Sequence, residues 1–126
     1  MLGPFEAWLA HRSLATLGLR LERSQANARA VAEALQGRDD ITDVHWPGIG
    51  PLVAMTLSSL EHAEQFLDAC TLVTQATSFG GVHTTAERRG RWGTDAIPDG
   101  FIRFSAGCED TEDLVADVLQ ALDSLT

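Results

Sequence analysis

The chain has 126 residues, of which 44% are hydrophobic and 21% are charged, as in ordinary soluble globular proteins. This length predicts a single domain with one hydrophobic core, and the composition argues against a disordered or fibrous protein. Eighteen acidic and nine basic residues give a net charge of −9, which argues against a nucleic-acid partner. We find neither a signal-peptide pattern nor an apolar stretch long enough to cross a bilayer, so we expect a cytoplasmic protein without a membrane partner.

The first predicted element is a long helix over about residues 3–36. Gly3-Pro4 is typical of a helix start, and Gly37 is typical of a helix end. Apolar residues recur at spacings of three and four along most of this segment, which predicts one buried face. The residues of this face are Leu14, Leu17, Leu21, Ala28, Val31 and Leu35.

Phe5 and Trp8 add an apolar patch near the start of this helix. Two interpretations of the patch are equally open. The first turns of the helix project beyond the local core and pack on another surface, or the aromatic side chains fold back onto the sheet of this domain. A helix of this length is unusual in so small a domain, and this favours neither interpretation over the other.

The segments Ile41–Trp46 and Leu52–Leu57 are predicted strands, separated by the turn signal Pro47-Gly48. A capping box formed by Ser58 and Glu61 predicts that a helix starts directly after the second strand. Its inner face would contain Ala63, Phe66, Leu67 and Cys70. A third short strand is predicted over Leu72–Thr74.

Residues 77–100 are rich in glycine, threonine and charge, which predicts a loop with one short helix around Ala86–Trp92. Phe101–Ser105 is a predicted fourth strand, and Asp110 with Asp113 would cap a last helix. This order predicts an α/β (α+β) two-layer sandwich, in which helices cover one face of a small, mostly antiparallel sheet. The whole chain, 1–126, would be one domain, with the sandwich over about 40–126.

Arg103 is the first candidate for a functional residue. Alternate side chains of a strand share a face, so Arg103 would lie beside Phe101 and Ser105. A guanidinium in an apolar strand needs an anionic partner, and its fork geometry fits a carboxylate. The partner would be a substrate carboxylate or an acidic residue of this chain. The spacing alone favours the internal ion pair.

Ser78-Phe79-Gly80-Gly81 is the second candidate, because adjacent glycines permit a ligand to approach the main chain closely. An ordinary turn explains the same pattern. We expect His83 to be solvated. We expect Arg88, Arg89 and Arg91 to form a solvated helix face with Trp92 anchored, and the alternative is that this cluster contacts a phosphate or an acidic neighbour across an interface.

The four histidines and two cysteines lack the spacing of a zinc site. Ser105 and Cys108 lack the base and orienting group that a nucleophile needs. We therefore expect no catalytic, cofactor-binding or metal-binding residue in this chain. Cys70 and Cys108 are predicted to be free thiols of a reducing compartment.

Several segments, in the right order, resemble one family of enzymes. Trp46-Pro47-Gly48 is similar to its Tyr-Pro-Gly, Ser78-Phe79-Gly80-Gly81-Val82 to its Ser-Leu-Gly-Gly-Val, and residues 102–110 to its Ile-Arg-Leu-Ser-Val-Gly-Ile-Glu-Asp. The start of the chain, Gly3-Pro4-Phe5-Glu6-Ala7-Trp8-Leu9, looks like the entry into the long linking helix of that family. The chain thus resembles, nearly end to end, the C-terminal domain of the cystathionine γ-lyase and cystathionine γ-synthase family.

This resemblance implies the small C-terminal domain of a fold-type I pyridoxal-phosphate enzyme. It implies that Arg103 binds the α-carboxylate of a sulfur amino acid and that Ser78 lines the same pocket. Members of the family hold pyridoxal 5′-phosphate covalently on a lysine of a larger preceding domain. That domain is absent here, and all nine basic residues of this chain are arginines. We therefore expect no covalently bound cofactor and no activity from this chain alone.

The resemblance implies a substrate-side domain for C–S bond cleavage or γ-replacement on cystathionine-like substrates. Its partners would be a cofactor-binding domain, in the same longer chain or in a separate polypeptide, and further copies in a homo-oligomer. A standalone, non-catalytic remnant or oligomerisation module is the alternative, and a free-standing amino-acid-binding domain is the third hypothesis. Thr77 stands where many members carry glutamate, which leaves the choice of substrate open.

Overall fold

The computed structural model describes residues 1–94 and 96–126. Its α-helices are α1 (Pro4–Leu14), α2 (Leu17–Leu35), α3 (Leu60–Ala69) and α4 (Thr111–Asp123). Its strands are β1 (Ile41–His45), β2 (Leu52–Leu57), β3 (Thr74–Gln75), β4 (Thr85–Arg88) and β5 (Phe101–Ser105), and a short 3-10 helix, η1, spans Arg89–Trp92.

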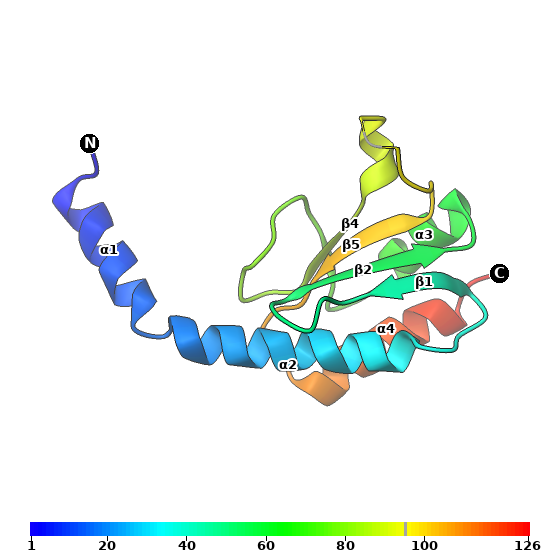
Figure 1. Cartoon of the computed structure of the whole chain (residues 1–126), viewed down its shortest axis with the longest axis horizontal. Coiled ribbons are helices and arrows are strands. Elements are labelled where there is room, and N and C mark those ends of the chain that lie inside the picture. Colours follow the sequence, from blue (N-terminus) through cyan, green and yellow to red (C-terminus); the bar gives the residue numbers. More distant parts are fainter. Residues whose placement is uncertain (95) are drawn as a thin grey trace.

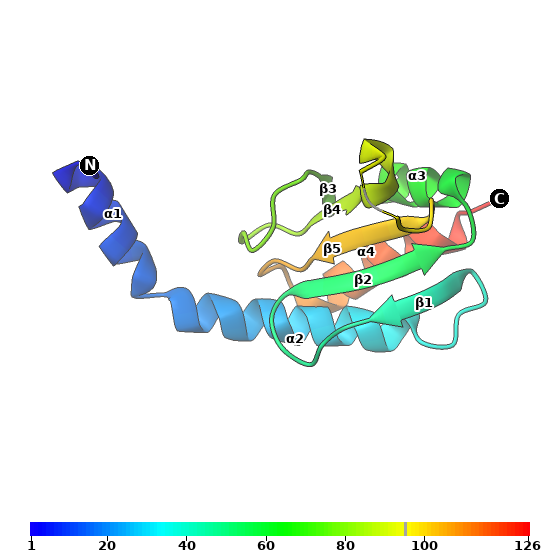
Figure 2. The same ribbon diagram turned by 45° about the horizontal axis from the view of Figure 1, so that its top comes forward.

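The strands form one sheet in the order β1-β2-β5-β4-β3. Neighbouring strands are antiparallel except for β3 and β4, which are parallel. Helices α2, α3 and α4 lie together against one face of this sheet, while the other face carries no helix of comparable length (Figure 1, Figure 2). The predicted two-layer sandwich with a mostly antiparallel sheet is confirmed.

The core lies between the sheet and these helices. Every second residue of the two central strands points into it, as the alternation of a strand requires, and these residues are Val53, Met55, Ile102 and Phe104. They pack against buried residues of the helices: Val31, Leu35, Phe66, Leu114 and Val118. Because the intervening strand residues face away from the core, the position of Arg103 between Ile102 and Phe104 places it on the face without helices.

The N-terminal region is two helices and not the single predicted one. The break lies at Ala15 and Thr16, where the low helix propensities of Thr16 and nearby Gly18 coincide with a lack of tertiary packing. Helix α1 buries no residue, and the first buried residue of α2 is Ser24. The predicted apolar face is therefore buried only in its second half. The interpretation in which the start of the helix projects from the domain is confirmed (Figure 1).

Three local expectations differ from the structure. The segment that was expected to be a helix over 86–92 begins as strand β4, because residues 85–88 pair with β5, and only η1 is helical. Ser59, and not Ser58, caps α3 by accepting a hydrogen bond from the His62 amide at 3.1 Å. The third strand pairs at 74–75, slightly later than predicted.

Asp110 caps α4 as predicted, by accepting from the amides of Glu112 and Asp113 at 3.0 and 3.4 Å. Residue 95, in the loop expected over 77–100, lies outside the described residues.

Candidate functional site

The candidate site lies on the face of the sheet that the helices leave uncovered. Strand β5 pairs with β2 on one side and β4 on the other, and this register places Arg103 between Ala54 and Glu87. The side chain of Arg103 is partly exposed, at 23%, whereas that of Glu87 is 0% exposed. The structure thus confirms that the arginine is on a strand and has an anionic partner, and it identifies the partner as Glu87.

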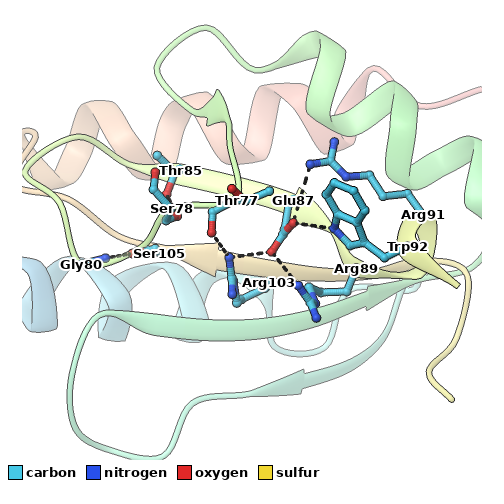
Figure 3. Close-up of polar contacts among 10 residues, drawn as sticks. All are labelled: Thr77, Ser78, Gly80, Thr85, Glu87, Arg89, Arg91, Trp92, Arg103 and Ser105. Carbon is cyan, nitrogen blue, oxygen red and sulfur yellow. Dashed lines mark hydrogen bonds and ion pairs between the residues drawn. The ribbon is translucent and has the colours of Figure 1, made fainter. Parts of the chain in front are cut away.

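Three residues from two segments, strand β4 and the loop before it, contact the Arg103 guanidinium, and Figure 3 draws two of them, Glu87 and Thr77. Its Nη2 lies 2.5 Å from Oε1 of Glu87 and donates a hydrogen bond to the carbonyl oxygen of Thr77. Its Cζ lies 4.9 Å from the centre of the Phe79 ring, a cation–π contact. Nε and Nη1 donate no hydrogen bond to any residue in 1–94 or 96–126. One side of the guanidinium is therefore held by the protein, and the other donors are available to a ligand.

The Glu87 carboxylate lies at the centre of a cluster of arginine side chains. Besides its contact with Arg103, it accepts from Arg89 Nη1 at 3.3 Å and from Trp92 Nε1 at 3.2 Å, and it lies 3.7 Å from Arg91 Nη2. A buried carboxylate would be costly without such partners. The side chains of Arg89, Arg91 and Arg103 are each partly exposed, whereas that of Glu87 is buried. The positive charges of the cluster therefore lie nearer to solvent than its negative charge.

Sequence reasoning missed Glu87, because residues 86–92 were expected to form a helix. The arginines of this segment are likewise not one solvated helix face. Arg89 and Arg91 contact Glu87, whereas Arg88 points to the opposite face, where its Nη2 pairs with Glu64 at 3.3 Å. Had residues 85–88 been predicted as a strand, Glu87 and Arg88 would have been expected on opposite faces of the sheet. That alternation is the signal that could have identified Glu87 as the partner of Arg103.

Ser78 is placed in the loop between β3 and β4, and it is exposed. Its carbonyl accepts a hydrogen bond from Thr85 Oγ1 at 2.8 Å. No hydrogen bond or ion pair joins Ser78 to Arg103 in the described part of the chain, although the preceding residue, Thr77, does contact the guanidinium. The Gly80 amide donates to Ser105 Oγ at 2.9 Å, which ties the same loop to the end of β5 (Figure 3).

The loop that carries Thr77 and Phe79 is anchored at its other end by a partly buried network. Glu109 accepts from the amide and hydroxyl of Thr84, at 2.5 and 2.7 Å, and the Cys108 amide donates to the Val82 carbonyl at 2.8 Å. A Cβ atom at Gly107 would lie 2.4 Å from that carbonyl oxygen, so the two segments approach more closely than any other residue permits. This contact fixes the loop next to β5.

Other candidate chemistries receive no support. His83 is exposed, and no group of three or more potential metal ligands occurs among the residues that the structure describes. Burial, together with the charge of Asp117, raises the pKa of the Cys70 thiol to about 12, which makes it a poor nucleophile. Over these same residues, no helix combines the length and apolar character that a membrane span requires.

Comparisons with known proteins agree with this fold. The family described as "Cys/Met metabolism PLP-dependent enzyme" matches residues 1–123. A Streptomyces coelicolor protein assigned as a cystathionine gamma-lyase is 54% identical over 98% of this chain and 36% of its own length. The cystathionine gamma-synthase of Haemophilus influenzae is 34% identical over 99% of this chain and 37% of its own length.

A solved structure from Campylobacter jejuni, described as an O-acetylhomoserine (thiol)-lyase with N′-pyridoxyl-lysine-5′-monophosphate, superposes with a TM-score of 0.88 at 28% identity. The match covers 98% of this chain and 34% of the other. The chain thus spans about a third of the length of these relatives. Since the family match extends over nearly all of its residues, the chain belongs to the pyridoxal-phosphate-dependent enzymes of cysteine and methionine metabolism.

Proposed function

We propose that this chain is the substrate-side part of a pyridoxal-phosphate-dependent enzyme that cleaves or replaces C–S bonds of cystathionine-like amino acids. The observation that supports the proposal is the placement of Arg103. The Arg103 guanidinium faces the open side of the sheet, and its Nε and Nη1 donate no hydrogen bond to residues 1–94 or 96–126, so it can bind the α-carboxylate of an amino acid. Relatives named for cystathionine support the substrate class.

In this proposal, Arg103 orients the substrate. A carboxylate bound to Nε and Nη1 has its α-carbon directed away from the sheet, toward whatever part of the enzyme covers this face. Holding a reactant in one orientation lowers the entropy cost of the reaction, and this is a large part of many catalytic effects. The exposed Ser78, close to the loop residue that contacts Arg103, is proposed to line the same pocket.

The residues of this chain do not fit covalent attachment of the cofactor. The family cofactor stabilises carbanions when it is bound to the amino group of a lysine, and the chain has no lysine. We therefore assign no cofactor contact and no catalytic residue to it. The attachment residue would be supplied by a cofactor-binding domain, in the same longer chain or in a separate polypeptide.

The exposed apolar side chains of α1 and of the first turns of α2 support the existence of such a partner. A homo-oligomer is part of the same proposal. We also propose a cytoplasmic location, on the grounds that both Cys70 and Cys108 are free.

A chimera tests the proposed function. The matched third of the Streptomyces coelicolor relative would be replaced by this chain, and release of thiol from cystathionine would be measured. We expect an active enzyme in which Arg103→Ala lowers kcat/KM by about a hundredfold or more, because the charged hydrogen bonds to the carboxylate are lost. Absorbance of the bound cofactor would show that each variant is folded and loaded.

Two controls accompany this experiment. Arg88→Ala removes an arginine from the other face of the same sheet and is expected to leave kcat/KM nearly unchanged. Arg103→Lys keeps the charge but loses the fork geometry, so it is expected to restore only part of the activity. A chimera that is loaded with cofactor and is equally active with and without Arg103 would contradict the proposal.

A standalone interaction module is the second candidate, and the exposure of α1 favours it. Phe5 and Trp8 are 66% and 56% exposed and stack on each other, with ring centres 6.1 Å apart. A chimera that is folded and loaded but inactive would favour this second candidate.

A further inference from the structure

We propose that Glu87 and Phe79 are positioning residues for Arg103, and that they hold its guanidinium so that Nε and Nη1 face an incoming carboxylate. This inference rests on the proposed function and assigns residues that act on the substrate only through Arg103. It arises from the contacts around the guanidinium, of which those with Glu87 and Thr77 are drawn in Figure 3.

Glu87 restrains Arg103 from the neighbouring strand. The two residues are directly opposite each other in the antiparallel pair of β4 and β5, so the backbone register itself sets their separation. Oε1 of Glu87 lies 2.5 Å from Nη2 of Arg103, and Oε2 accepts from Trp92 Nε1 at 3.2 Å. The tryptophan and the strand therefore fix the carboxylate, and the carboxylate fixes one nitrogen of the guanidinium.

The charge of Glu87 is divided among several partners. Arg89 and Arg91 contact the same carboxylate, at 3.3 and 3.7 Å. The one negative charge of Glu87 cannot fully neutralise the two guanidinium groups of Arg91 and Arg103, so the ion pair orients Arg103 while the local potential still attracts an anion. A single isolated ion pair would orient the arginine but would not leave a positive potential to attract an anion.

Phe79 restrains the guanidinium from the loop. The Arg103 Cζ lies 4.9 Å from its ring centre, and the ring is itself exposed, so it contributes little to the core. Stacking on a ring face restricts the plane of the guanidinium, whereas the ion pair restricts one end of it. The family pattern that this segment resembles has leucine at position 79, which has no ring face to offer.

Such restraint has a functional consequence. A free arginine side chain loses rotamer entropy when a ligand orders it, and a side chain that is ordered before binding does not lose that entropy when the ligand arrives. Glu87 and Phe79 would thus increase the fraction of encounters in which the carboxylate meets a correctly oriented Arg103.

Side-chain NMR of the 126-residue chain tests the inference, with Arg103→Lys used to identify the Nε–H signal of Arg103. We expect an order parameter near the rigid value of about 0.85 in the wild type and below about 0.6 in Glu87→Gln. Phe79→Leu is expected to give an intermediate value. The matched controls, Glu64→Gln on the opposite face and Val82→Ala in the same loop, are expected to leave it unchanged.

Titration with acetate adds a second measurement. Phe79→Leu changes no charge, so its loss of positioning is expected to weaken acetate binding at Arg103 by about two- to fivefold. Glu87→Gln also alters the local charge, so only its order parameter is interpreted. Should Glu87→Gln fail to fold, Glu87→Asp keeps the charge but withdraws the carboxylate by one methylene, and it is expected to lower the order parameter as well.

The outcomes separate the inference from the proposed function. An Arg103 signal that stays equally ordered in the Glu87 variant and in Phe79→Leu would overturn the inference alone. An ordered wild-type signal that does not respond to acetate would instead contradict the role of Arg103 as a carboxylate site, and with it the proposed function. A general loss of stability without a change in order at Arg103 would show that Glu87 is only structural.

Discussion

At the scale of single residues, Asp117 on α4 combines burial with an unusually complete set of hydrogen bonds. It accepts from the amide and hydroxyl of Thr71, at 2.8 and 2.6 Å, and from the Leu72 amide at 2.9 Å. Burial acts to raise the pKa of this carboxyl, but the hydrogen bonds from Thr71, Leu72 and Gln120 outweigh it, so the pKa lies below its ordinary value. The ionised form of Asp117 therefore stabilises the fold.

The first prediction concerns Asp117→Asn, which we expect to lower the free energy of unfolding by about 1–3 kcal/mol at pH 7. Because the pKa of Asp117 is lower in the folded chain, its contribution is present above the unfolded pKa of about 3.9 and is lost as the pH falls through the folded value. Urea unfolding at pH 7 and at pH 3 measures both effects, and the difference between variant and wild type should shrink in acid. Asp39→Asn, at an exposed position, serves as the control; an equal loss there would contradict the assignment.

The second prediction concerns the reactivity of Cys70. Its pKa of about 12, raised by burial and by the charge of Asp117, leaves roughly a thousandfold less thiolate at pH 8 than an unperturbed cysteine has. Alkylation of Cys70 by iodoacetamide should therefore be slow in the folded chain and fast in urea, as mass spectrometry of the labelled peptide would show. Rapid labelling of the folded chain at this position would be inconsistent with the raised pKa of this half-buried thiol.

How far single residues could be predicted is shown by Arg103 and Glu87. The strand pattern predicted that Arg103 needs an anion, because an apolar strand cannot otherwise hold a guanidinium. The pattern could not identify Glu87 as the anion, because the partner of Arg103 depends on which strands are neighbours and in which register they pair. The internal ion pair that the spacing favoured does exist. The role as a carboxylate site, which the resemblance implies, stays a prediction, as does that of Ser78.

At the scale of elements, α2 shows the limit of a periodic pattern. Leucines recur at helical spacing through α1 and α2, yet Leu35 is 0% exposed and Leu21 is 49% exposed. Periodicity predicts which side chains share a face, but their burial depends on what lies opposite, and only the second half of α2 has the sheet and α4 beside it (Figure 2).

The third prediction uses this contrast within one helix. Leu35→Ala is expected to lower the free energy of unfolding by about 2–5 kcal/mol, because it removes buried methyl groups and leaves a cavity. Leu21→Ala makes the same chemical change at an exposed position and is expected to stay within about 0.5 kcal/mol of the wild type. Thermal or urea unfolding of the two variants compares them directly, and similar losses in both would mean that the first half of α2 packs against the domain.

At the scale of the whole molecule, the chain combines a complete small sandwich with a projecting, unpacked segment. The sandwich was predictable, because capping, turn and alternation signals agree along residues 40–126. The projection of α1 was not predictable, because the sequence was equally compatible with Phe5 and Trp8 folding back onto the sheet. An isolated helix as short as α1 is marginal in water, and its apolar side chains are stabilised only when another surface covers them.

The last prediction follows from this exposed segment. We expect the chain to self-associate as its concentration rises, because covering Phe5 and Trp8 removes their apolar area from water. The double variant Phe5→Ser with Trp8→Ser should weaken association more than tenfold, since each buried aromatic contributes about 1.5–3 kcal/mol. Sedimentation velocity over a concentration series measures the effect, and His11→Ser on the same helix is the control. A chain that remains monomeric throughout would contradict self-association through α1. Because both variants leave the core unchanged, their unfolding temperatures should match that of the wild type, and this separates loss of association from loss of folding.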